Sequence, residues 1–253
     1  MPHLEINQAA CYYSGNLKKT GTPVIFCHGS GGAHHHWIYQ LKGLKEPAQQ
    51  IAVSLPGHGL SEGSPFNSVA AYRDWLHHFA TRAGLVPFVA AGHSLGGAIV
   101  LDYALQYPDE LKGLILIGTG GRLKVLPALL EELAEGKIPK SFCDYLYSPV
   151  TPEAMVKKGR EEMQSTDPAL YHTDLTACDG FDLLDRLDKI NLPTLIICGS
   201  DDRLTPLKYS RSLENSIPGS KLVIIEEAGH MVMLEKPVQV NQAINDFIAT
   251  LDK

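Results

Sequence analysis

Six short apolar runs, separated by longer amphipathic segments, constrain the fold of this chain most strongly. Within each run, Val, Ile, Leu, Phe and Ala follow one another with few polar residues between them. A strand that is apolar on both sides must be covered on both faces, as in a parallel sheet between two layers of helices. The six predicted strands are residues 23–27, 50–54, 87–91, 113–117, 193–197 and 222–225.

Helical periodicity occurs between several of these runs. Apolar residues recur every three or four positions over residues 69–79, and a second helix is predicted over residues 98–105. Pro237 can begin a last helix, whose apolar positions continue to Leu251. Alternating strands and helices predict an α/β fold with a mostly parallel, doubly wound sheet.

Residues 121–190 interrupt this alternation, because they contain no convincing strand and begin with helical spacing over residues 126–133. We predict that they form a helical cap (lid) over the C-terminal edge of the sheet. The core would then consist of residues 1–120 and 191–253. An ordinary helical layer is the alternative interpretation, but functional sites of doubly wound sheets lie at that edge.

Composition and charge limit the partners of the chain. Its 253 residues are 44% hydrophobic and carry a net charge of −6, without a long basic run, which disfavours nucleic acid and anionic membranes. No apolar run approaches the roughly 18 residues of a membrane span. Residues 1–5 lack the basic and apolar regions of a signal peptide. We expect a monomer or a homodimer that binds neither nucleic acid nor membrane.

The cysteines are scattered and form no CxxC pair, which is typical of a reducing compartment and predicts a cytoplasmic location. Cys27 and Cys198 fall within apolar runs and are predicted to be small core residues. The five cysteines are Cys11, Cys27, Cys143, Cys178 and Cys198.

Two segments match the pattern G-x-S-x-G, and only one has the context of a nucleophile. Residues 59–63 hold Ser61 in a turn-like stretch without a preceding strand, so we predict a surface loop there. Residues 92–96 hold Ser94 between a predicted strand and a predicted helix. Such a sharp turn strains the serine backbone and exposes its hydroxyl, and glycines two positions away prevent Cβ clashes. Ser94 is therefore the candidate nucleophile, and a glycine-rich turn without chemistry is the alternative.

A serine nucleophile needs a base, and the base needs an acid that orients it. On this type of scaffold the order along the chain is serine, acid, histidine. His230, in the loop after the strand at 222–225, is the one histidine that follows the late acidic candidates. Asp201 and Asp202 both follow the strand at 193–197 and should point in different directions. These residues alone leave the choice between the two acids open.

The oxyanion that forms during acyl transfer needs two backbone N–H donors. One is expected from Leu95, directly after the nucleophile. The other is expected from the glycine-rich stretch 28–32 after the first predicted strand, where Ser30 is our candidate. A purely structural turn is the alternative for this stretch.

These motifs together resemble the α/β-hydrolase superfamily. The branch concerned holds small serine carboxylesterases, enol-lactone hydrolases, carbon–carbon bond hydrolases and cofactor-free perhydrolases. The resemblance implies the α/β-hydrolase fold with a helical cap insertion. It covers about residues 20 to 250, and its motifs appear in the family's order at residues 28–29, 56–61, 92–96, 199–206 and 229–230.

The resemblance also selects the acid. In the family it lies three residues after a glycine and four before a proline. Gly199 and Pro206 therefore imply Asp202. Asp201 would then be a solvated neighbour.

By this resemblance the chain is expected to be a serine hydrolase that cleaves a small carboxylic ester through an acyl-enzyme intermediate, without a cofactor. A carbon–carbon bond or enol-lactone hydrolase would use the same catalytic triad. A small-molecule receptor on the same fold is the non-enzymatic alternative. Relatives with an aspartate nucleophile, such as haloalkane dehalogenases and epoxide hydrolases, are disfavoured by Ser94.

The substrate pocket is predicted from residues near these motifs and in the cap, although a plain core role is an alternative for several of them. His34, His35 and His36 are conspicuous, but three consecutive helical residues do not share a face. With no carboxylate pair nearby in the sequence, we predict no metal site there. The candidate pocket residues are His28, Gly29, Trp37, His93, Phe142, Tyr145 and Met231.

The charge of the predicted cap bears on the substrate. Residues 121–190 contain nine Lys and Arg but thirteen Asp and Glu. An acidic carrier protein would be repelled by such a surface, and a coenzyme A thioester would be mildly disfavoured. A free, neutral ester with a short to medium apolar acyl group is the expected substrate.

Overall fold

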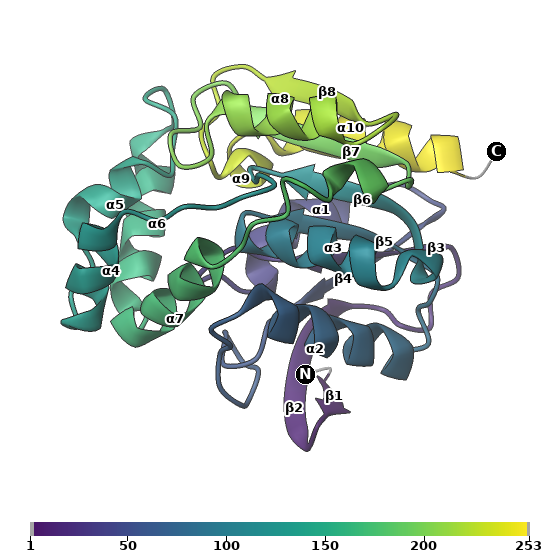
Figure 1. The fold of residues 1–253 in the computed structure, drawn as a ribbon, viewed down its shortest axis with the longest axis horizontal. Coiled ribbons are helices and arrows are strands. Elements are labelled where there is room, and N and C mark those ends of the chain that lie inside the picture. The colour runs from purple at the N-terminus through teal and green to yellow at the C-terminus, as the bar shows by residue number, and fades with distance from the viewer. Residues whose placement is uncertain (1–2, 252–253) are drawn as a thin grey trace.

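The computed structural model describes residues 3–251, which form one eight-stranded sheet with helices on both faces (Figure 1). The strand order is β1-β2-β4-β3-β5-β6-β7-β8. From β4 to β8 all neighbouring strands are parallel, and β1 and β2 are antiparallel. The strands are β1 (His3–Ile6), β2 (Ala9–Gly15), β3 (Thr22–Cys27), β4 (Ala48–Val53), β5 (Phe88–His93), β6 (Leu111–Ile117), β7 (Thr194–Gly199) and β8 (Lys221–Ile225).

All six predicted strands are confirmed, with ends shifted by one or two residues. Alternate residues of each strand point into two different cores. In β3, for example, Ile25 belongs to one core and Phe26 to the other, and both are fully buried. This two-sided burial explains the continuous apolar runs.

The hairpin β1–β2 was not predicted. It lies at the edge of the sheet, where only one side of a strand is covered. In β2 only Cys11 and Tyr13 are buried, two positions apart, so no continuous apolar run marks the strand.

Each face of the sheet is covered by a separate set of helices. Buried residues of α2, α3 and α8 pack in one core, and those of α10 pack in the other, where the partly buried Leu41 of α1 joins them. Short 3-10 helices are η1 (His34–Trp37), η2 (Pro108–Glu110) and η3 (Leu187–Lys189). The α-helices of these layers are α1 (Ile38–Gly43), α2 (Val69–Arg82), α3 (Leu95–Gln106), α8 (Leu207–Ser216), α9 (Val232–Glu235) and α10 (Pro237–Leu251).

The chain between β6 and β7 is mainly helical, and Figure 1 shows its α-helices gathered beside the sheet at the left of the view. An isolated bridge between Arg122 and Asp182 pairs its two ends. The division into core and cap remains a prediction, and we keep the word cap for residues 121–190. The helices are α4 (Pro127–Ala134), α5 (Lys140–Asp144), α6 (Glu153–Ser165) and α7 (Pro168–Asp179).

Two further sequence expectations concern the cysteines and membrane-spanning helices. Cys27 and Cys198 are fully buried in strands, as predicted for core residues, and none of the five cysteines forms a disulfide. Within residues 3–251, no helix combines the length and apolar character that crossing a bilayer requires.

Candidate active site

Ser94 lies on the sharp turn between β5 and α3, with φ 53° and ψ −115°. This positive φ is strained for a serine and matches the backbone expected for a nucleophile turn. The turn leaves no room for side chains on the flanking glycines. A Cβ on Gly92 would lie 2.1 Å from the Gly96 carbonyl oxygen, and a Cβ on Gly96 would lie 2.2 Å from that of Cys27.

The second G-x-S-x-G match is a loop, as predicted, but Ser61 is not on the surface. Its side chain is buried, donates to the Ser54 carbonyl at 2.7 Å and accepts from the Tyr12 N–H at 2.8 Å. The prediction of a surface loop is therefore wrong for this residue. Ser61 ties the loop to the backbone near β2 and β4 and does not line the cavity that Ser94 lines.

His230 and Asp202 meet at the carboxyl ends of β8 and β7. The Nδ1 atom of His230 lies 2.9 Å from Oδ2 of Asp202, and both side chains are almost fully buried. Asp202 also accepts hydrogen bonds from the backbone N–H groups of Leu204 and Thr205 and from the Thr205 hydroxyl. These bonds fix the carboxylate, and the carboxylate in turn keeps the proton of a neutral imidazole on Nδ1, which leaves Nε2 free to accept one.

The surroundings of Asp202 keep it ionised. Burial raises the pKa of this carboxyl, but the charge and hydrogen bond of His230 and the bonds from Thr205 outweigh it and bring the pKa below its ordinary value. An ionised acid behind the histidine is what stabilisation of an imidazolium requires.

Asp201 is not the solvated neighbour that the sequence suggested. Its Oδ2 accepts a hydrogen bond from the Ser148 hydroxyl at 2.5 Å, and its backbone N–H donates to the Ala228 carbonyl. No hydrogen bond between Asp201 and His230 is found among the described residues, and Asp201 links the loop after β7 to the cap. This contact joins residues 53 positions apart and leaves no signature in the local sequence.

The two candidate N–H donors for an oxyanion come from the loop after β3 and from the first residue of α3. Leu95 is the first residue of α3, so its N–H has no partner inside the helix. No hydrogen bond from the Ser30 N–H is found among the described residues, whereas the N–H of Gly31 donates to Asp174 and that of Gly32 donates to Gly29.

Asp174 on α7 holds the glycine-rich loop in place. Its Oδ2 accepts from Gly31 N–H at 2.8 Å and lies 2.9 Å from Nε2 of His58, while Oδ1 accepts from the Tyr72 hydroxyl at 2.6 Å. Because Nδ1 of His58 faces the Pro56 carbonyl, both ring nitrogens face acceptors, and the pair is best described as imidazolium and carboxylate. Burial and the charge of Asp174 raise the pKa of Tyr72, so its hydroxyl remains a donor.

Asp174→Ala is expected to destabilise the protein by about 3–5 kcal/mol, because it leaves a buried charge on His58 without its partner. Tyr72→Phe keeps the carboxylate and should cost about 1–3 kcal/mol. Urea denaturation gives both values. The control is Asp179→Ala on the same helix, whose half-exposed side chain lies 3.7 Å from Lys124 and should cost about 1 kcal/mol or less. Equal losses for Asp174→Ala and Asp179→Ala would contradict the role of Asp174.

Two buried histidines are neutral by geometry. His93 Nε2 donates to the His230 carbonyl at 2.9 Å, and its buried Nδ1 has no hydrogen-bond partner in the described part of the chain. His28 Nδ1 donates to the Gly29 carbonyl at 2.8 Å, and Nε2 accepts from the Leu55 N–H at 3.0 Å. Burial, and then neighbouring histidines, lower the pKa of both rings well below the ordinary value.

The lowered pKa of His93 predicts that the free energy of unfolding depends on pH. Unfolded His93 takes up a proton below about pH 6.5, but folded His93 does not. Its stabilising effect is therefore fully present above that pH and is lost as the pH falls. Relative to His93→Gln, whose amide can replace the Nε2 donor, the wild type should lose about 1.4 kcal/mol of unfolding free energy per pH unit between about pH 6 and 5. Parallel pH curves for the two proteins would refute this.

One cavity of about 560 Å³ brings these groups together. Ser94 and His230 both line it, as does Thr205, and they follow the carboxyl ends of β5, β8 and β7. Its other walls come from the cap. The cap side chains in the lining include Leu129, Phe142, Tyr145, Tyr147, Met163 and Tyr171.

The predicted pocket residues separate into two groups. Gly29, His93, Phe142, Tyr145 and Met231 line the cavity. His28 and Trp37 do not line it and are fully buried, so placing them in the pocket was wrong. The His28 ring turns into the core, where it bonds the backbone of Gly29 and Leu55. The Trp37 ring packs against Phe26, with ring centroids 4.9 Å apart.

The structure adds residues that the sequence analysis missed. Asp174 contacts Gly31, and Glu162 contacts His36, in both cases far apart in the chain. Thr205 contacts Asp202 within a short turn. Asp174 had a usable signal, because it shares the buried face of α7 with Tyr171 and Cys178. An acid on an apolar helix face is unusual unless it is paired.

The comparisons with known proteins agree with this fold. Residues 22–237 match a family model described as alpha/beta hydrolase fold, so the chain belongs to this family. Over 99% of its length the chain matches 97% of a solved thermophilic esterase, with 33% identity and a TM-score of 0.85. These findings define a protein of the hydrolase class.

The names of the curated relatives narrow the kind of hydrolase only partly. A pimeloyl-(acyl-carrier protein) methyl ester esterase of Neisseria meningitidis is 29% identical, over 89% of this chain and 93% of its own length. The dihydrolipoyllysine-residue acetyltransferase component of the acetoin cleaving system of Pseudomonas putida is 28% identical over 90% of this chain. The chain spans 64% of that second relative, just under two thirds of its length.

Proposed function

We propose that this protein is a serine hydrolase that cleaves small carboxylic esters through an acyl-enzyme intermediate, with Ser94, His230 and Asp202 as its triad. One observation carries the proposal. Ser94, on its strained turn, and His230, hydrogen-bonded to Asp202 at 2.9 Å, line the same cavity at the carboxyl edge of a parallel sheet.

The chemistry follows from these groups. Ser94 attacks the acyl carbonyl carbon while Nε2 of His230 takes the hydroxyl proton. The N–H groups of Ser30 and Leu95 stabilise the oxyanion. His230 then protonates the leaving alcohol, and the acyl group stays on Ser94. A water then gives a proton to His230 while its oxygen attacks the acyl carbon. The bond between the acyl carbon and Ser94 Oγ breaks, the acid leaves, and His230 returns the proton to Oγ. Asp202 stabilises the imidazolium in both half-reactions, and no cofactor takes part.

The volume and lining of the cavity support a substrate with an apolar acyl group of short to medium length. Its volume of about 560 Å³ lies within the range of small-molecule pockets, and aromatic and aliphatic cap residues wall it. The cap has nine basic and thirteen acidic residues and is therefore net negative. Because it would repel an acidic carrier protein, this charge supports a free neutral ester as the substrate.

A substrate panel tests the proposal against its alternatives. Purified protein is incubated with p-nitrophenyl esters of increasing chain length, an enol-lactone and a ring-cleavage dienoate. We expect the highest kcat/KM on the esters. Faster turnover of the dienoate or the enol-lactone would favour a carbon–carbon bond or lactone hydrolase. Saturable binding of a small ligand without turnover of any compound would favour a receptor.

The form of the ester is tested separately, because one relative is named for an ester on an acyl-carrier protein. Matched acyl groups are presented on a neutral alcohol, on coenzyme A and on a carrier protein, at low and moderate salt. We expect the neutral ester to be preferred. A preference for the carrier that weakens as salt rises would overturn this substrate assignment and leave the serine mechanism intact.

A further inference from the structure

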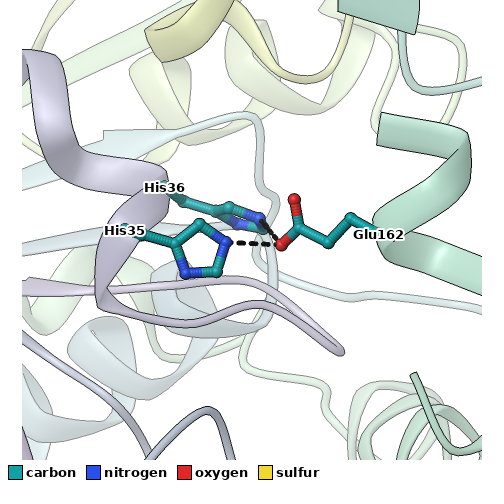
Figure 2. A group of neighbouring side chains, drawn as sticks. All are labelled: His35, His36 and Glu162. Atoms are coloured by element: carbon teal, nitrogen blue, oxygen red, sulfur yellow. Dashed lines mark hydrogen bonds and ion pairs between the residues drawn. The ribbon is translucent and has the colours of Figure 1, made fainter. Parts of the chain in front are cut away.

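His35, His36 and Glu162 form a cluster outside the triad (Figure 2). The histidines belong to η1, and Glu162 belongs to α6 of the cap, more than 120 residues later. Nε2 of His35 lies 2.6 Å from Oε1 of Glu162, and Nε2 of His36 lies 2.9 Å from the same oxygen. Both rings thus point at one carboxylate oxygen.

No metal site was predicted for His34, His35 and His36, because three consecutive helical residues do not share a face and no carboxylate pair lies nearby in the sequence. The cluster in the structure is of another kind. In the structure His34 turns away to bond Ser54, whereas the rings of His35 and His36 converge with centroids 4.9 Å apart. The carboxylate comes from a helix distant in the chain, which the local sequence does not reveal.

The donor atoms lie close enough together to share one metal ion after a small opening of the cluster. The three lie within 4.8 Å of one another. Around a tetrahedral zinc ion with bonds of about 2.0–2.2 Å, neighbouring ligand atoms are about 3.3 Å apart. A shift of several tenths of an ångström on each side would therefore open the cluster enough for an ion. Two imidazoles and one carboxylate are also a donor set that zinc uses in proteins.

Among the described residues, the polar atoms of the cluster do not all have hydrogen-bond partners. The Nδ1 atom of His36 is buried and has no hydrogen-bond partner within residues 3–251, where Nε2 is the one ring nitrogen of His36 that makes a hydrogen bond. Both histidines bond Oε1 of Glu162, and no contact of Oε2 is found among the described residues.

We propose that His35, His36 and Glu162 bind a divalent transition-metal ion of the zinc class. The ion joins η1 of the core to α6 of the cap and keeps one coordination position open for water. His36 and Glu162 also line the substrate cavity, so the ion lies in its wall. The ring of His36 packs against Gly32, in the loop that carries Ser30. The metal therefore clamps the cap at the edge of the candidate oxyanion loop.

Metal titration tests the site without reference to activity. Untagged protein is stripped with a chelator and titrated with Zn²⁺ by calorimetry and with Co²⁺ by visible absorption. We expect one ion per chain. Loss of an outer-shell partner alone weakens metal sites by about 10–100-fold, so His35→Ala, His36→Ala and Glu162→Gln should each weaken Zn²⁺ binding by at least about tenfold. Circular dichroism and Tm establish that each variant is folded.

Two matched controls locate the ion. His34→Ala removes the neighbouring histidine of the same run and should leave Zn²⁺ affinity unchanged. Ser94→Ala should also leave it unchanged, so failure of the metal site and failure of the serine mechanism are distinguishable. Zn²⁺ should protect α6 from hydrogen exchange in the wild type but not in Glu162→Gln. A wild-type Kd for Zn²⁺ above about 0.1 mM, or affinity unchanged by Glu162→Gln, would overturn the proposal.

Discussion

Ser94→Ala is expected to lower kcat for ester hydrolysis by about 10⁵–10⁶-fold, as removal of a triad serine does elsewhere. The loss follows because no other group can carry the acyl chain. The fold should remain, since alanine and serine both carry a Cβ and meet the same strain at φ 53°. A fluorophosphonate probe, which labels activated serines, should label the wild type and not Ser94→Ala.

Ser61→Ala is the matched control for the second G-x-S-x-G match. Its buried hydroxyl makes two hydrogen bonds, so its loss should lower stability by about 1–3 kcal/mol. Labelling and kcat should stay near wild type at a temperature where the variant is folded. Peptide mapping that found the probe on Ser61 would show that the nucleophile is wrongly assigned.

Asp202→Asn should have the second largest effect, with kcat reduced by about 10⁴-fold. An amide at this position can donate to Nδ1 of His230 and so favour the tautomer with the proton on Nε2, which cannot accept the proton of Ser94. Substrate binding should change little, because the carboxylate sits behind the histidine. Kinetics on one ester, with Tm measured alongside, separate this loss from instability.

Asp201→Asn keeps the shape of the side chain and can still accept from Ser148 through its amide oxygen. We expect less than about a tenfold change in kcat and a small decrease in Tm, because the residue links the cap to the loop and does not contact His230. Equal losses of kcat in Asp201→Asn and Asp202→Asn, at unchanged Tm, would contradict the assignment of the acid.

Local sequence was informative wherever the physical requirement was itself local. A strand covered on both faces needs a continuous apolar run, so β3 to β8 were recognisable, whereas the one-sided edge strands β1 and β2 were not. The turn at Ser94 likewise requires glycine at 92 and 96, because a Cβ at either position meets backbone about 2 Å away. The candidate nucleophile, base and N–H donors could therefore be named from short motifs and their order.

Contacts between distant segments depended on the tertiary structure. Asp174 reaches Gly31 across 143 positions, and Glu162 reaches His36 across 126, so neither pair has a spacing that a motif could encode. The same packing turned His28 and Trp37 into the core and not into the cavity.

The sequence by itself determined the class of fold, the turn that strains Ser94 and the order of the candidate catalytic residues, since each follows from backbone sterics or strand burial within a few positions. The tertiary structure alone decided that Asp174 faces His58 and that Glu162 faces His35 and His36. A side chain finds its partner only when helices such as α6 and α7 pack against the loops of the core, and that packing is the sum of many weak contacts spread over the whole chain.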